Sequence, residues 1–230
     1  MATVQLSPEE TRAVVRALRR PVGRYSYGRA SQLSGVPTRT LHHWASVGLF
    51  VPDFNALSPK GWSYRDLVLV RVFAWLRSLG MKPAVAGDRV AGVRAALATG
   101  ALDATVPLRA TGRAVFVEGE DFDRLSGEAL LPNMIVLLQG FDLVAPVDDI
   151  GRMWGPSLVR PSEFTAISPA VVSGEPFLLA TRIPTATLYA LRCEQSLTTG
   201  DIVELYPGVT AAQVDDAISL EGRIRHHQAA

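Results

Sequence analysis

The stretch GVPTRTLHHWASVGLFVP, which runs from Gly35 to Pro52, joins a turn glycine to a short helix with an unusually polar face. The preceding segment, residues 27–35, predicts one short helix that ends at the glycine, and residues 37–48 predict a second. Two helices joined by a glycine-containing turn form the helix-turn-helix arrangement, in which the start of the second helix reaches base edges. A shared apolar seam at helical spacing is expected from Leu33, Leu41, Trp44 and Val47. The second helix either reads DNA or is a core helix whose polar residues only face water.

The polar residues of this second helix are suited to base and phosphate recognition. Arginine can bind guanine bidentately, and threonine can contact a base or a phosphate. The turn-rich residues 49–64 predict a small hairpin or wing, and the side chains at its far end are placed to touch flanking phosphates. The candidate DNA-binding residues are Arg29, Thr38, Arg39, Thr40, His42, His43, Lys60, Trp62, Tyr64 and Arg65.

Charge divides the chain into two unlike parts. Residues 1–90 hold thirteen Lys and Arg against five Asp and Glu, a net charge of +8, whereas residues 91–230 hold ten against seventeen, a net charge of −7. This asymmetry favours a polyanionic partner for the first part, with a solvated basic face as the alternative.

Composition excludes several classes of protein. Hydrophobic residues make up 48% of the 230 residues, enough for a packed core, but no apolar run approaches the roughly 20 residues of a membrane span. With no signal-peptide pattern at the N-terminus, we expect a soluble, cytoplasmic protein without a membrane partner. The single cysteine, Cys193, excludes an internal disulfide and any multi-thiolate metal site, and is expected to be a small core residue.

Helix-start signals and turn residues predict a mainly α fold with small β elements. Capping patterns begin helices at Ser7, Ser63 and Thr210, and residues 113–118 predict a strand. Residues 130–144 are apolar and are compatible with helix or strand. The expected organisation is an N-terminal helix (1–24), a winged helix-turn-helix domain (25–99), a mixed α/β middle region (100–163), and a three-helix C-terminal domain with a basic tail (164–230).

Residues from about 25 to 82 resemble the winged helix-turn-helix of the MerR family. The matching features are the turn at Gly35-Val36, Arg39-Thr40-Leu41, Trp44, Gly48-Leu49, Pro52, the aromatic-rich Trp62 to Leu67, and Leu79-Gly80. The resemblance implies contact with double-stranded operator DNA. MerR effector domains usually follow a long dimerising helix and often carry metal-binding cysteines. This chain has neither, so metal or thiol sensing is not expected.

Residues 167–218 are similar to a small homeodomain-like domain found in antitoxins. The similarity rests on Gly174, Pro176, Thr181-Arg182-Ile183-Pro184, Asp201-Ile202, Tyr206-Pro207 and Thr210. Together with a MerR-like head, this looks like a VapB-type antitoxin, which implies a PIN-domain ribonuclease toxin as partner and repression of the shared operon. The candidate toxin-binding residues are Arg182, Arg223, Arg225 and His226, because guanidinium groups pair with the carboxylates that hold Mg²⁺ in such nucleases. A frayed basic terminus is the alternative for the last three.

No catalytic or metal-binding pattern emerges from the remaining residues. The histidines lie in adjacent pairs, His42-His43 and His226-His227, which diverge by about 100° on a helix and do not chelate. We therefore expect no enzyme activity and no cofactor. The runner-up function is a one-component MerR-like transcription regulator that senses a small ligand through the middle region. In either case a homodimer is expected, because one head of this size buries too little duplex for a tight specific site.

Overall fold

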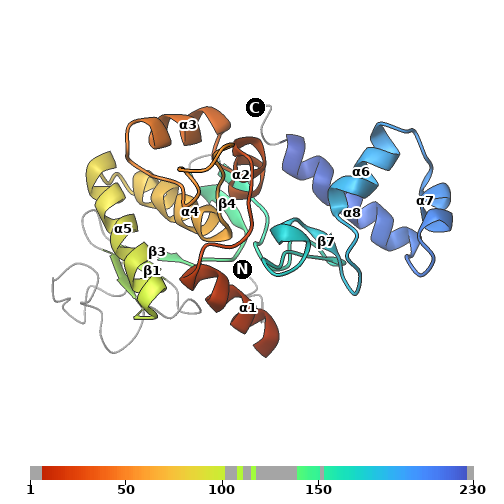
Figure 1. Cartoon of the computed structure of the whole chain (residues 1–230), viewed down its shortest axis with the longest axis horizontal. Coiled ribbons are helices and arrows are strands. Elements are labelled where there is room, and N and C mark those ends of the chain that lie inside the picture. The colour runs from red at the N-terminus through yellow and green to blue at the C-terminus, as the bar shows by residue number, and fades with distance from the viewer. Residues whose placement is uncertain (1–6, 102–107, 111–114, 118–138, 151–152, 227–230) are drawn as a thin grey trace.

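The computed structural model describes residues 7–101, 108–110, 115–117, 139–150 and 153–226, and within these ranges the chain is mainly helical with small β elements, as predicted (Figure 1). The helices are α1 (Pro8–Arg19), α2 (Tyr27–Ser34), α3 (Thr38–Ser46), α4 (Tyr64–Ser78), α5 (Pro83–Thr99), α6 (Thr185–Cys193), α7 (Thr199–Leu205) and α8 (Ala211–His226). The strands are β1 (Leu108–Ala110), β2 (Val115–Val117), β3 (Gln139–Phe141), β4 (Val147–Ile150), β5 (Met153–Gly155), β6 (Thr165–Ala166) and β7 (Phe177–Leu178).

The predicted capping signals fix three helix starts. The Ser7 hydroxyl accepts a hydrogen bond from the backbone N–H of Glu10, whose carboxylate accepts one from the backbone N–H of Ser7 at 2.9 Å. The same reciprocal box forms between Ser63 and Asp66 at the start of α4, and Thr210 and Gln213 exchange the equivalent bonds before α8. These boxes satisfy N–H groups that the first helical turn would otherwise leave unpaired.

Helix α4 is the centre of the head, the name used here for α1 to α5. Every residue from Tyr64 to Leu76 is buried, because α1, α2, α5 and β4 all pack around this helix. Leu33 and Leu41 are buried as predicted, and Trp44 packs on Phe73 with 4.3 Å between the ring centroids. The prediction that Val47 belongs to the apolar seam is wrong. This side chain is 54% exposed, since α3 ends at Ser46 and Val47 no longer follows the helical period.

Residues 142–150 and 153–159 pack against the head. The Arg71 side chain is fully buried in α4 and donates hydrogen bonds to the backbone carbonyls of Ala145 at 3.1 Å and Pro156 at 2.7 Å, as well as to that of Leu33 in α2. Burial lowers the pKa of Arg71 to about 9. The Tyr64 hydroxyl donates to the Leu158 carbonyl at 2.9 Å. The head and this part of the middle region therefore share one core.

The strands form three small antiparallel sheets. β1 lies between β2 and β3, while β4 pairs with β5 and β6 pairs with β7. β2 confirms the strand predicted for residues 113–118. Of residues 130–144, the last six continue from β3 into a turn, and residues 130–138 lie outside the described ranges.

Helices α6, α7 and α8 extend to one side of the head and enclose a core of their own (Figure 1). Leu188, Ile202 and Val214 are fully buried in it. The last turns of α8 return to the head, because Leu220 and Ile224 belong to the head's core. We call residues 164–226 the tail domain. Among the described residues, no helix is long and apolar enough to cross a membrane.

Candidate nucleic-acid interface

The turn between α2 and α3 requires glycine at position 35. Gly35 ends α2 with φ of 80°, a left-handed conformation that glycine adopts without steric cost. A Cβ atom at this position would lie 2.3 Å from the carbonyl oxygen of Trp154, so the space is closed as well. Val36 is buried directly after it, and its backbone N–H donates to the Ser34 hydroxyl. The turn thus fixes the direction in which α3 leaves α2.

Helix α3 presents its polar residues outward. Arg39, His42 and His43 are exposed, and Thr38 and Thr40 are half-buried, while Leu41 holds the opposite face in the core. A helix with this division stays anchored while arginine and imidazole donors face the solvent. These are the groups that read base edges in a major groove.

The His42 ring stacks on the Tyr27 ring of α2, with 3.9 Å between centroids and 5° between planes. Tyr27 in turn meets Trp62 edge-on at 5.3 Å. Partial burial raises the pKa of the Tyr27 hydroxyl. Sequence reasoning missed Tyr27, because nothing in the spacing of residues 27 and 42 shows that their rings meet. The stack fixes the orientation of His42 beside Arg39.

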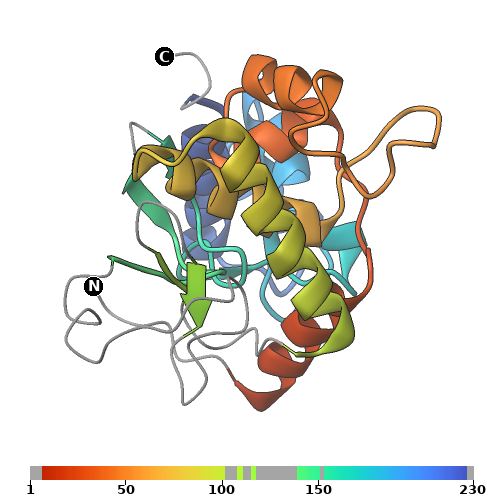
Figure 2. The same ribbon diagram turned by 90° about the vertical axis from the view of Figure 1, so that its left-hand side faces the viewer.

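Residues 53–61, called the wing here, project beside α3 (Figure 2). Two backbone bridges close the base of the wing, Phe54 to Gly61 and Tyr25 to Trp62. Lys60 lies exposed on the wing, as its predicted role requires. The exposed side chain of Arg24 donates to the Pro59 carbonyl at 2.5 Å and adds a second basic group here that the sequence analysis missed.

An ion network cross-links the base of the wing and corrects the prediction for Arg65. The Arg65 guanidinium pairs with Asp53 at 2.8 Å and is 9% exposed, so it anchors the wing and does not face a phosphate. Arg94 of α5 bridges Asp53 and Asp66 at 3.1 and 3.0 Å. Burial, together with the nearby charge of Asp53, raises the pKa of Asp66 to about 6. The network ties the wing to α4 and α5.

The predictions that Trp62 and Tyr64 contact DNA are also corrected. Both side chains are fully buried, because the Tyr25–Trp62 bridge draws this segment into the core. The Tyr64 hydroxyl is already used by the Leu158 carbonyl. Burial raises the pKa of Tyr64 far above its ordinary value. These aromatic residues therefore belong to the core that supports the candidate interface.

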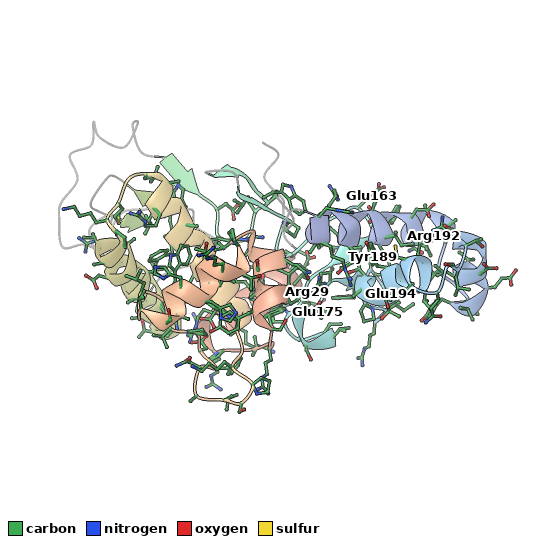
Figure 3. The ribbon with its side chains drawn as sticks, turned by 90° about the horizontal axis from the view of Figure 1, so that it is seen from above. Arg29, Glu163, Glu175, Tyr189, Arg192 and Glu194 are labelled. Atoms are coloured by element: carbon green, nitrogen blue, oxygen red, sulfur yellow. The ribbon has the colours of Figure 1, made fainter. Side chains whose placement is uncertain are left out.

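Arg29 joins the head to the tail domain, which corrects its predicted role at DNA (Figure 3). Its guanidinium binds Glu221 of α8 through two bonds of 2.7 and 3.1 Å, Glu175 at 2.6 Å and Gln32 at 3.0 Å. The Arg29 side chain is 11% exposed and that of Glu221 is fully buried. Nε and both Nη atoms are engaged, so the group has little left to offer a phosphate.

Glu221 is the hub of this junction. It also accepts hydrogen bonds from the Thr185 hydroxyl at 2.9 Å and from Arg225 at 3.2 Å. Burial alone would raise the pKa of Glu221. The hydrogen bonds from Arg29, Thr185 and Arg225 and the positive charge of Arg29 outweigh burial, so the pKa lies below its ordinary value of 4.5. A second link lies nearby, where the Tyr25 hydroxyl donates to the Gly174 carbonyl at 2.8 Å.

The four candidate toxin-binding residues do not form one cluster. Arg182 is exposed and lines a hollow with α1, whereas the other three lie on the last turn of α8. There the Arg223 guanidinium lies 5.8 Å from the centre of the Trp154 ring, and that of Arg225 lies 4.5 Å from the centre of the Tyr189 ring. His226 is exposed, and His227 lies outside the described residues. The alternative of a frayed terminus does not hold for residues up to 226, which are helical.

Cys193 is exposed on α6, not in the core as predicted, because α6 buries only Thr185 and Leu188.

Comparison with known proteins finds a similarity for part of the tail domain. No curated protein and no solved structure matches the chain. Residues 166–219 match the family model described as Protein of unknown function (DUF433). The match covers the stretch from β6 to α8 and leaves the head outside it.

Proposed function

We propose that this chain is a DNA-binding antitoxin of a type II toxin-antitoxin pair, which neutralises a PIN-domain ribonuclease and represses the shared operon. The observation that carries the DNA-binding half is the outward face of α3, where Arg39, His42 and His43 are exposed beside the wing with Lys60. The rigid turn at Gly35 and the ion network under the wing hold this surface in place before DNA arrives. Such preorganisation lowers the cost of binding.

The contact set of this proposal is Thr38, Arg39, Thr40, His42, His43 and Lys60. Arg39 on the second helix of the pair is the candidate for a bidentate contact with guanine, and Lys60 on the wing is the candidate for a flanking phosphate. The homodimer stays part of the proposal, with two heads on half-sites about 34 Å apart or at multiples of that spacing.

The antitoxin half rests on the resemblance of the head and the tail domain taken together, and on two exposed side chains of α8. Arg223 and His226 are exposed in the last turn of α8. A guanidinium in this position is suited to enter an acidic metal site. Arg225 is less free, since it packs on Tyr189 and pairs with Glu221.

The test is co-expression of the full chain with the nuclease that co-purifies with it, followed by assays of RNA cleavage and of DNA binding. Sites are first selected from random duplexes with the purified full chain, and binding is measured by gel shift. We expect the wild type to bind selected duplexes and to suppress cleavage, and the Arg39→Ala variant to suppress cleavage with weakened DNA binding. A full chain that selects no sequence and inhibits no co-purifying nuclease would refute the proposal. DNA binding that changes with a small ligand, without a nuclease, would favour the one-component regulator.

A further inference from the structure

A hollow of about 850 Å³ lies between α1 and residues 160–182 of the chain. We call it the α1 groove. Its apolar lining includes Ile167 and Phe177, which are largely buried, and Leu179, which is partly open. Neither the candidate DNA contacts nor the end of α8 takes part in it.

The rim of the α1 groove carries an excess of positive charge. Of its two carboxylates, Glu10 is already engaged, because it pairs with Arg160 at 2.6 Å and caps α1 through Ser7. Arg12, Arg16 and Arg182 are exposed, and the structure gives their side chains no ion pair or hydrogen bond within the described residues. Arg12 and Arg16 stand four positions apart on one helix, a spacing at which like charges repel by a few tenths of a kcal/mol. The helix dipole favours Arg16, which lies in the last turn of α1, but it gives no such reason for Arg12.

The α1 groove lies away from the DNA-reading surface. α1 and α3 are at opposite ends of the head in both views (Figures 1 and 2). A ligand in the α1 groove would therefore leave α3 and the wing free.

The chemistry of the α1 groove selects one class of occupant. Guanidinium groups bind carboxylates in a bidentate geometry, and an apolar floor rewards the burial of a hydrophobic side chain. A nucleic acid backbone carries no apolar side chain that could be buried on this floor. An extended peptide that alternates acidic and apolar side chains satisfies both features.

We propose that the α1 groove binds an acidic peptide segment of a partner protein, with its carboxylates on Arg12, Arg16 and Arg182 and an apolar side chain against Ile167 and Phe177. This site goes beyond the proposed function and does not depend on the partner's being a nuclease.

The test is selection of random twelve-residue peptides, displayed on phage, against the immobilised full chain. We expect enrichment of peptides rich in Asp and Glu with apolar residues between them. A selected peptide, labelled with fluorescein, should bind the Arg12→Gln, Arg16→Gln double variant and the Arg182→Gln variant about tenfold or more weakly, the loss expected for charge-assisted hydrogen bonds. The Arg20→Gln variant is the matched control, because Arg20 follows α1, is exposed and does not line the α1 groove.

Position is tested by a benzoylphenylalanine cross-linker at Ala170, an exposed residue of the lining, and at Ala91, an exposed residue of α5 outside the α1 groove. The peptide should cross-link at position 170 and not at position 91. Equal weakening by Arg20→Gln, enrichment without acidic residues, or no enrichment would overturn the proposal. The proposal would also be overturned if native mass spectrometry found a small organic acid bound to the wild type but not to the arginine variants. None of these results depends on DNA binding or RNA cleavage, so the proposed function is tested separately.

Discussion

The ion cluster between α2 and α8 makes the sharpest prediction about stability. Replacement of Arg29 by Met removes three of the charge-assisted bonds at the junction, two to Glu221 and one to Glu175. Glu221 is fully buried and would keep only Thr185 and the longer contact with Arg225. Breaking one side of a buried pair costs about 3–5 kcal/mol, because the remaining charge stays desolvated. Since Glu175 is 30% exposed and can be solvated, we expect a cost near the lower end.

Hydrogen exchange in α8 measures this cost where it arises. A loss of about 3 kcal/mol should reduce the protection of the slowest amides of α8 by about a hundredfold, whereas amides of α4 should change less. The double variant Arg29→Met, Glu221→Met removes both charges and should recover part of the loss. A matched control is Arg192→Met on the exposed face of α6, for which a change within about 0.5 kcal/mol is expected.

The same variant separates a structural role from a DNA contact. Arg29→Met should bind the selected duplex as tightly as the wild type at temperatures where both are folded. If α8 keeps its protection while duplex affinity falls, Arg29 acts at the DNA and the reasoning from burial is refuted.

Three further predictions concern α3 with the wing, the buried Glu221 and the end of α8. Arg39→Ala should cost about 1–3 kcal/mol on the selected site and relax base preference, while Lys60→Ala should weaken all duplexes alike and lower the salt slope by about one; unchanged gel-shift titrations in both would remove α3 and the wing from the interface. Because the pKa of Glu221 lies below 4.5 in the folded chain, its stabilising contribution is present above about pH 4.5 and is lost as the pH falls further. In the Glu221→Gln variant the urea midpoint of unfolding should therefore depend less on pH below this value than in the wild type. Parallel pH profiles of the two proteins would contradict this. Arg223→Gln with His226→Gln should release RNA cleavage in the mixed complex and leave DNA binding intact, and full inhibition by this variant would place the toxin contact elsewhere.

The sequence predicted the elements whose signals are local. The capping boxes at Ser7 and Ser63, the glycine end of α2 and the three helices of the tail domain need only neighbouring residues, and the structure has them all. The exposed face of α3 follows from helical spacing in the same way.

The errors concern residues whose environment is set by distant partners. Arg29 resembled a surface arginine on a short helix, but its main partner lies 192 positions later in the chain. Arg65 pairs with a carboxylate twelve positions earlier that no helical spacing connects to it. Trp62 is buried through its bridge to Tyr25, and such long-range pairing has no signature in composition or period. Residue type alone therefore does not separate a candidate contact from an anchor.

The bonds of Arg71 have a consequence for biosynthesis. Its guanidinium holds carbonyls at residues 33, 145 and 156, so two of its three acceptors leave the ribosome more than 70 residues after Arg71 itself. Until they arrive, a charged group in the middle of the head's central helix lacks these two partners, and the head remains unfinished. A nascent chain or a fragment that stops short of residue 156 thus lacks part of the packing around α4, the helix on which α2 and α3 rest. Completion of the head is in this way tied to synthesis of the segment that leads into the tail domain.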